Sequence, residues 1–131
     1  MFVKRFIEWI GTKQKLDAHE YNPPLVSEGD LWWCAIGENI GIEISGKGEN
    51  FTRPVIVLKK LGRLAFFGVP TTTNTERKGS WYMPFKHKGV DEVAMLTQAR
   101  IFSYKRLSTK MGELDDEDYK KIKEVFVRLF S

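Results

Sequence analysis

The chain has 131 residues, a formal net charge of +4 at pH 7 and 42% hydrophobic residues. These values are typical of one soluble domain with a core, and the mild basic excess favours a polyanionic partner without establishing one. The single cysteine, Cys34, excludes an internal disulfide and a cysteine-rich zinc site. Because it lies in an apolar run, we interpret it as a buried hydrophobe rather than a catalytic thiol.

No segment approaches the roughly 18 consecutive apolar residues that a membrane span requires. At the N-terminus, Lys4, Arg5 and Glu8 interrupt any signal-peptide core. We therefore expect a cytoplasmic protein without a membrane partner.

The first element expected is a helix over residues 2–17, followed by a break at Asn22-Pro23-Pro24. Gly11 weakens the middle of this helix. Its apolar residues at helical spacing are Phe2, Val3, Phe6, Ile7 and Ile10. We expect this stripe to pack on the core; a helix lying on a membrane surface is the alternative.

The middle of the chain predicts a series of strands. They are expected over residues 31–36, 54–58, 64–69, 81–85 and 93–104, with a short last strand over 110–114 and a long glycine-containing loop over 37–51. A helix capped by Asp115 follows, with apolar residues Tyr119, Ile122, Phe126, Leu129 and Phe130 on one face. Short strands with a terminal helix indicate a mainly β, α+β domain built as a small antiparallel barrel.

Two strand ends carry groups that can bind an anion. Arg53 precedes one apolar run, and Thr71, Thr72 and Thr73 end another. A guanidinium fork suits phosphate, and threonine hydroxyls can donate to the same oxygens. Alternatively, Arg53 pairs with an acid at the start of its strand, and the threonines are β-prone residues leading into a turn.

Other candidate groups are less distinctive. Glu43 has apolar neighbours that would raise the pKa of its carboxyl by desolvation, although a solvated loop glutamate is the favoured interpretation. Gly46-Lys47-Gly48 is not a phosphate-binding P-loop, but a mobile loop beside a groove can clamp a long ligand. The acidic residues 113–118 are explained by a helix start, and His19 and His87 share no ligand spacing, so we expect no metal.

A set of motifs in a fixed order carries a family resemblance. In chain order they are Gly29-Asp30-Leu31-Trp32-Trp33, Ile40-Gly41-Ile42-Glu43, Arg53-Pro54-Val55-Ile56-Val57-Leu58, Val69-Pro70-Thr71-Thr72, the segment 91–100 with Gln98 and Arg100, and Lys105-Arg106-Leu107. Over roughly residues 28–130 the chain resembles the MazF/PemK family of toxin endoribonucleases. We expect residues 1–27 to be an N-terminal helical extension and residues 28–131 to be the family domain.

The resemblance implies an SH3-like barrel, usually a homodimer, that cuts single-stranded RNA, often mRNA, without a metal or cofactor and is neutralised by a cognate antitoxin protein. By position, Arg53 and Thr72 match the family's catalytic pair, and Glu43 matches the glutamate of the loop before the arginine. Gln98 and Arg100 match the polar pair beside the RNA groove. We also expect Lys47, Thr71 and Thr73 to contact RNA.

The chain departs from the family pattern at three places. One is the late strand, where some members have an Arg-x-Asp pair and this chain has Arg100-Ile101-Phe102. Ile44 follows the glutamate where many members have glutamine, and the loop from Ser45 to Thr52 is longer than usual. The alternatives to a nuclease are an SH3-like module or toxin that acts by binding a protein such as gyrase, and a simple RNA binder. Trp81 and Tyr82 are candidates for base stacking, although core or dimer packing is the favoured interpretation of both.

Overall fold

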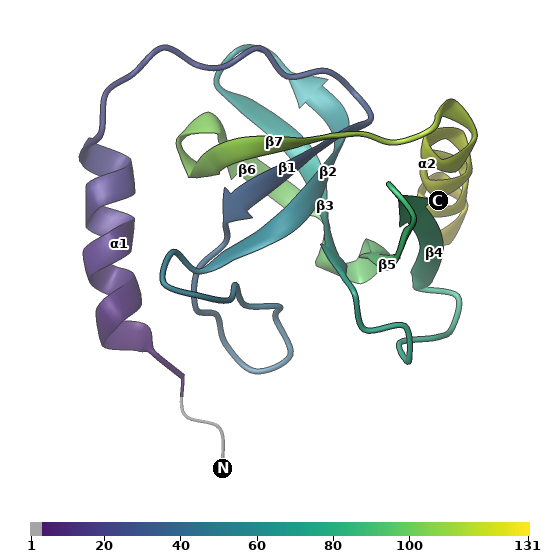
Figure 1. Cartoon of the computed structure of the whole chain (residues 1–131), viewed down its shortest axis with the longest axis horizontal. Helices are drawn as coiled ribbons and strands as arrows, with labels where there is room; N and C mark the ends of the chain where they lie inside the picture. Colours follow the sequence, from purple (N-terminus) through teal and green to yellow (C-terminus); the bar gives the residue numbers. More distant parts are fainter. Residues whose placement is uncertain (1–3) are drawn as a thin grey trace.

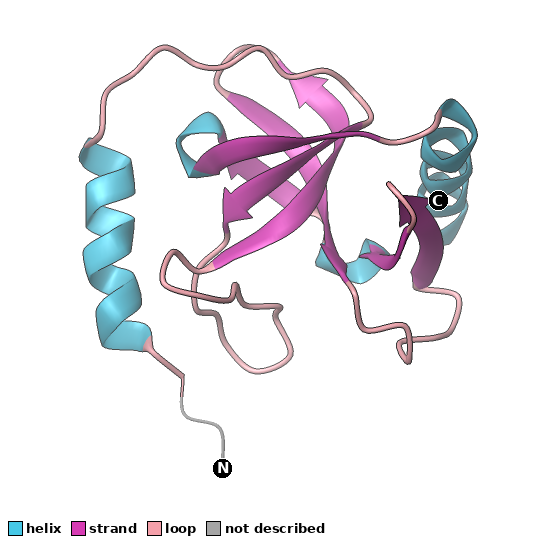
Figure 2. Ribbon diagram, viewed as in Figure 1, coloured by secondary structure: helices cyan, strands magenta, loops and turns pink. Residues whose placement is uncertain are grey.

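The computed structural model describes residues 4–131 and contains one antiparallel sheet with a helix at each end of the chain (Figures 1 and 2). The elements are α1 (Phe6–Ala18), β1 (Asp30–Ala35), β2 (Thr52–Leu61), β3 (Ala65–Thr72), β4 (Tyr82–His87), β5 (Val90–Met95), β6 (Arg100–Ser103), β7 (Leu107–Glu113) and α2 (Asp116–Leu129). Short 3-10 turns at Leu96–Gln98 and Tyr104–Arg106 flank β6. The predicted mainly β architecture with an N-terminal and a C-terminal helix is confirmed.

The strand order is β4-β5-β3-β2-β1-β7, and β6 pairs separately with β3. One edge of β3 pairs with β2, while its other edge pairs with β6 over residues 65–68 and with β5 over Thr71 and Thr72. Within the described chain β7 pairs with β1 alone, so hydrogen bonds do not close the sheet into a complete barrel.

The predicted strand over 93–104 is wrong as one element. Its first part ends β5 and its last part forms β6, with the turn at Leu96–Gln98 between them. β5 and β6 follow one another along the same edge of β3. Six residue steps from Ala94 to Arg100 face only three from Thr71 to Gly68, so the extra residues leave the strand pairing and form the turn. The predicted short strand over 110–114 is the second part of the longer β7.

Apolar side chains fill both faces of the sheet. Residues 55–58 of β2 are all buried, as their uninterrupted apolar run predicts, with Val55 and Val57 in one core cluster and Ile56 and Leu58 in the other. Helix α2 covers the second cluster through Ile122, Tyr119 and Phe126. It begins directly after Asp115, as expected, although the Asp115 side chain makes no capping hydrogen bond.

Cys34 lies in the first cluster and has no exposed surface, which raises the pKa of its thiol. The prediction of a buried hydrophobe in place of a catalytic thiol is therefore supported by the fold.

Helix α1 packs differently from the prediction. Phe6, Ile7 and Ile10 are exposed, Ile7 to 84%, whereas Trp9 is 6% exposed. The Trp9 ring lies against Gly37 and 5.4 Å from the ring of Phe51, so one aromatic side chain docks the helix and the apolar stripe faces outward. The predicted stripe residues Phe2 and Val3 lie outside the described residues.

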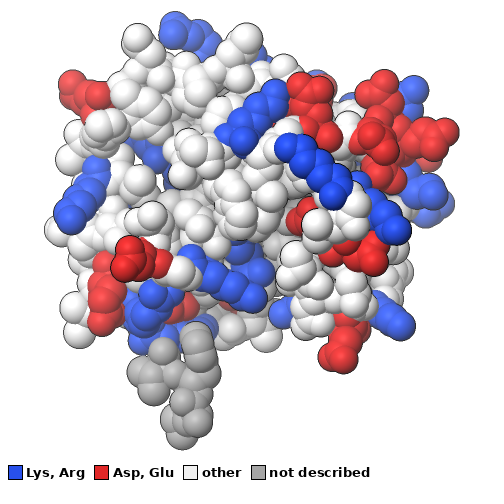
Figure 3. Space-filling model, viewed as in Figure 1, with Lys and Arg blue, Asp and Glu red and all other residues white. Residues whose placement is uncertain are grey.

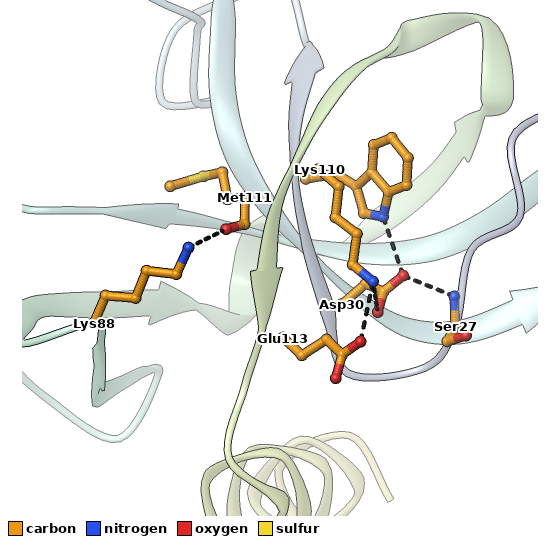
Figure 4. A network of polar contacts seen from close by, with 7 residues as sticks. Ser27, Asp30, Lys88, Lys110, Met111 and Glu113 are labelled. Carbon is orange, nitrogen blue, oxygen red and sulfur yellow. Dashed lines mark hydrogen bonds and ion pairs between the residues drawn. The ribbon is translucent and has the colours of Figure 1, made fainter.

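A buried carboxylate fixes the start of β1 against β7 (Figure 4). Asp30 accepts hydrogen bonds from the Ser27 amide and the Trp32 indole. Lys110 on β7 lies 3.4 Å from Asp30 and donates to Glu113. This network explains the polar residue that opens an otherwise apolar strand. Among residues 4–131, no helix is long and apolar enough to cross a membrane.

Candidate functional site

Arg53 and Thr72 come together because β2 and β3 are antiparallel neighbours. Val55 pairs with Pro70 and Ile56 with Val69. Continuing this register towards the ends of the strands aligns Arg53 with Thr72. A hydrogen bond from the Thr71 hydroxyl to the Pro54 carbonyl, 3.2 Å, ties the same ends together.

A cavity of about 330 Å³ opens at this point, lined by Arg53, Lys47 and residues 71–73. It also includes Trp33 and Pro54. Four of the predicted RNA contacts and catalytic groups therefore share a wall with Arg53. The structure thus brings together the two sequence segments from which an anion site is predicted.

The Arg53 guanidinium is half-buried and oriented by the loop between β1 and β2, which we call the β1–β2 loop (residues 36–51). Its Nε donates to the Ser45 carbonyl at 2.5 Å. Burial, and then repulsion by Arg77, lowers the pKa of Arg53 from its ordinary value. Among the ion pairs of residues 4–131 none involves Arg53, so the predicted alternative of a structural pair with an acid does not describe it.

The three threonines differ in what their hydroxyls face. Thr72 is 6% exposed and its Oγ1 accepts the Asn74 amide at 3.1 Å. Thr71 is fully buried and donates to Pro54 and towards the Glu92 carboxylate. Thr73 is exposed. Thr72 and Thr73 are therefore better placed for an incoming ligand than Thr71, whose burial favours a supporting role.

A second cavity of about 850 Å³ adjoins the first and shares Arg53 and Lys47 with it. Glu43 lines this second cavity, so Arg53 belongs both to the cavity that contains Glu43 and to the one that contains Thr72. The Glu43 carboxylate is exposed and accepts the Ile40 amide at 3.1 Å. The expected alternative of a solvated loop glutamate is thus the arrangement found.

Gln98 supports the loop that carries Glu43. Its Nε2 donates to the Ile42 carbonyl and its Oε1 accepts the Ile44 amide, so it holds the residues on both sides of Glu43. A third cavity of about 320 Å³ contains Gln98, Glu43 and Arg100. Arg100 is exposed, and its guanidinium lies 5.0 Å from the Phe102 ring. The second cavity shares Glu43 and Gln98 with the third and Arg53 and Lys47 with the first, and we call the three cavities together the groove.

The middle of this groove is rich in cations. Its largest cavity is lined by Lys4, Arg5, Lys47, Arg53 and Arg77, against the acids Glu38 and Glu43. In the space-filling view, blue side chains gather at the lower centre, over the β1–β2 loop (Figure 3). Sequence reasoning missed Lys4, Arg5 and Arg77, which lie outside the recognised motifs and carry no local signal of their own.

The remaining candidates have different surroundings. Tyr82 lines the largest cavity, whereas the ring of Trp81 lies 6.3 Å from that of Phe130 on α2. His87 is buried, and burial lowers its pKa. Across residues 4–131, no group of three or more His, Cys, Asp or Glu side chains is placed to hold a metal ion.

Comparison with known proteins adds independent information. The family model of PemK-like, MazF-like toxins of type II toxin–antitoxin systems matches residues 27–130. The crystal structure of MazF (Form-I) from Deinococcus radiodurans superposes with a TM-score of 0.65 at 18% identity, covering 85% of this chain and 98% of that one. That identity makes the likeness one of fold, and a search of curated proteins finds no match. Because the family model spans most of the chain, the protein belongs to the PemK-like, MazF-like toxins of type II toxin–antitoxin systems, a family of toxin endoribonucleases.

Proposed function

We propose that the protein is an endoribonuclease that cuts single-stranded RNA, mRNA in particular, by attack of the RNA's own 2′-hydroxyl and without a metal. The observation that carries this proposal is the position of Arg53. Arg53 is half-buried and lines two adjoining cavities of the cationic groove, one of which contains Thr72 and the other Glu43. A partly desolvated cation that shares its two cavities with an acid and a hydroxyl suits the stabilisation of a phosphorane.

In the proposed reaction the 2′-oxygen loses its proton and forms a bond to the adjacent phosphorus. The bond from phosphorus to the 5′-oxygen breaks, and that oxygen takes up a proton. The products are a 2′,3′-cyclic phosphate and a 5′-hydroxyl. Arg53 donates to the non-bridging oxygens, and Thr72 adds a hydrogen bond that fixes the phosphate. Glu43 accepts the 2′-hydroxyl proton or orients Arg53.

The rest of the groove is proposed to bind the RNA on either side of the cut. Lys47 and Thr73 flank Arg53, while Arg100 lies at the other end, beyond Gln98. Thr71 remains a predicted RNA contact, and because its side chain is buried it would act indirectly, by supporting its neighbours. The family match also supports a cognate antitoxin, and the cationic groove suits an acidic antitoxin segment. We further propose a homodimer in the cytoplasm and a boundary near residue 27 between the extension and the family domain.

The test is cleavage of a long labelled single-stranded RNA by the wild type and by Arg53→Ala. Loss of a charged donor aimed at a transition state costs about 100- to 1000-fold in rate. Arg63→Ala is the matched control, because Arg63 is an exposed arginine in the turn after the opposite end of β2. We expect the control to cleave as the wild type does and Arg53→Ala to lose most activity while remaining folded.

The chemistry is tested on the substrate side. A single 2′-deoxy substitution at the cut nucleotide removes the attacking oxygen and should abolish cleavage there, and excess EDTA should leave cleavage intact. Fragments that end in a 2′,3′-cyclic phosphate support the mechanism. Wild-type activity in Arg53→Ala, or cleavage at the 2′-deoxy position, would contradict it, and uncut RNA would favour a toxin or module that acts by binding.

A further inference from the structure

The residues before the family match contact the candidate site directly. The match begins at residue 27, yet Lys4 and Arg5 line the same cavity as Arg53 and Glu43. In Figure 1, α1 runs beside the β1–β2 loop, far from α2 on the other side of the sheet. The structure therefore gives the N-terminal segment a place at the groove that the family motifs do not describe.

Two side chains of this segment hold the β1–β2 loop by hydrogen bonds. Lys4 Nζ donates to the carbonyls of Asn39 and Gly41 at 2.7 and 3.3 Å. Arg5 donates from Nη1 to the Gly48 carbonyl at 3.0 Å. Its guanidinium carbon also lies 4.2 Å from the centre of the Phe51 ring. These contacts reach both the early and the late part of the loop.

A buried acid of the β1–β2 loop, Glu38, binds the backbone of the N-terminal segment. Glu38 is 5% exposed, and its Oε2 accepts the Arg5 amide at 2.8 Å. This hydrogen bond is the largest cause of a lowered pKa at Glu38, so the carboxyl is a carboxylate at neutral pH. Trp9 packs on Gly37 and Phe51, which lie at the two ends of the loop. The segment is thus anchored by charge and by an aromatic contact.

A chain of hydrogen bonds runs from this anchor to Arg53. Lys4 donates to the backbone carbonyl of Asn39, and the backbone N–H of Asn39 donates to Ser45 Oγ. The Ser45 carbonyl in turn accepts Arg53 Nε. Few side chains separate the N-terminal segment from the guanidinium, and each step is a direct contact.

We propose that Lys4, Arg5 and Trp9, the N-terminal brace, position the β1–β2 loop and through it orient Arg53 for RNA cleavage. The catalytic consequence rests on the proposed function, whereas the structural consequence does not. Lys4 and Arg5 are positioning residues, because their side chains donate hydrogen bonds to carbonyls of the β1–β2 loop. A direct contact between these cations and RNA is the competing explanation.

The structural test is amide hydrogen exchange measured by NMR. The reporters are the amides of Gly46, Lys47 and Thr52, which close the loop onto the Gly37, Thr52 and Lys47 carbonyls, and the Arg53 Nε–H itself. Removing one hydrogen bond to a charged group speeds local opening roughly tenfold. We expect this acceleration in Arg5→Ala and Lys4→Ala, partial recovery in Arg5→Lys, and none in Lys15→Ala, an exposed lysine on α1.

The functional test measures RNA cleavage and RNA binding by the same variants. If Lys4 and Arg5 act as a brace, their replacement by alanine lowers the cleavage rate and leaves the salt dependence of RNA binding unchanged. If Lys4 or Arg5 instead binds a phosphate directly, its removal reduces the slope of log affinity against log salt by about 0.7 per phosphate on single-stranded RNA. Unchanged exchange at the loop and at Arg53 in Arg5→Ala and Lys4→Ala overturns the proposal, whatever happens to cleavage. A wild type that does not cut RNA refutes the proposed function alone, since exchange still tests the brace.

Discussion

The docking of α1 can be tested by a substitution at a glycine that touches no RNA in our proposal. Gly37 has a φ of +89°, and a Cβ there would overlap the indole of Trp9. Gly41 in the same loop also has a positive φ, +58°, but a Cβ there would meet nothing within 4 Å. Gly37→Ala and Gly41→Ala therefore both strain the backbone, and only the first displaces Trp9.

The magnitudes follow from these two environments. An alanine in the left-handed region costs about 1–2 kcal/mol, which is the expected effect of Gly41→Ala on the free energy of unfolding. At Gly37 the backbone strain is joined by weaker packing of Trp9, and removal of a buried tryptophan costs about 3–5 kcal/mol. We expect Gly37→Ala to lose roughly 3–5 kcal/mol in total, because partial movement of the indole relieves some of the overlap.

The assay is urea unfolding of both variants, of Trp9→Ala and of the double variant Gly37→Ala/Trp9→Ala. Residues in contact show coupling of about 0.5–3 kcal/mol, so the double variant should lose less than the sum of its two single variants. Ile7→Ala serves as the control on α1, because Ile7 is largely exposed and should change stability little. Equal losses for Gly37→Ala and Gly41→Ala, or additive effects with Trp9→Ala, would refute the docking of α1 through Trp9.

Two further predictions concern groups behind the groove. Burial raises the pKa of Glu92, so its ionisation destabilises the folded state as the pH rises through that pKa. In urea unfolding, the free energy of unfolding of Glu92→Gln should rise relative to that of the wild type as the pH increases from about 4 to about 8. A difference between the two proteins that is the same at both pH values would contradict this. Gln98→Ala removes two hydrogen bonds to the Glu43 segment, worth about 0.5–1.5 kcal/mol each. It should speed amide exchange of Ile44 and slow RNA cleavage, and unchanged exchange would argue against its supporting role.

The sequence predicts the parts of the fold that local patterns control. The continuous apolar run at residues 55–58 identifies a strand buried on both faces, and the acidic residues after Asp115 identify the start of α2. The division of residues 93–104 into β5 and β6 is not visible in the sequence. It depends on how two strands share one edge of β3, which is a property of the whole sheet.

The candidate site also has features that the sequence predicts and features that depend on the whole fold. Arg53 and Thr72 are predictable because they belong to two adjacent strands and a recognisable motif order. Thr71 lies in a part of β3 where residues 68–72 are all buried, and its partners Pro54 and Glu92 come from distant segments. The docking of α1 was predicted on the wrong residues, since helical periodicity selects Phe6, Ile7 and Ile10, while the niche at Gly37 accepts Trp9.

Two independent constraints meet at the Arg53 guanidinium. The pairing of β2 with β3 sets the backbone of Arg53 opposite Thr72, and the β1–β2 loop sets its side chain through the Ser45 carbonyl. Strand pairing is supported by the buried core, whereas the loop depends on Gln98 from one side and on Lys4 and Arg5 from the other. Since a displacement of about 1 Å at a reacting group can cost about 100-fold in rate, the loop is the more sensitive constraint. A substitution in residues 4–9 can therefore weaken cleavage without changing the strands that carry Arg53 and Thr72.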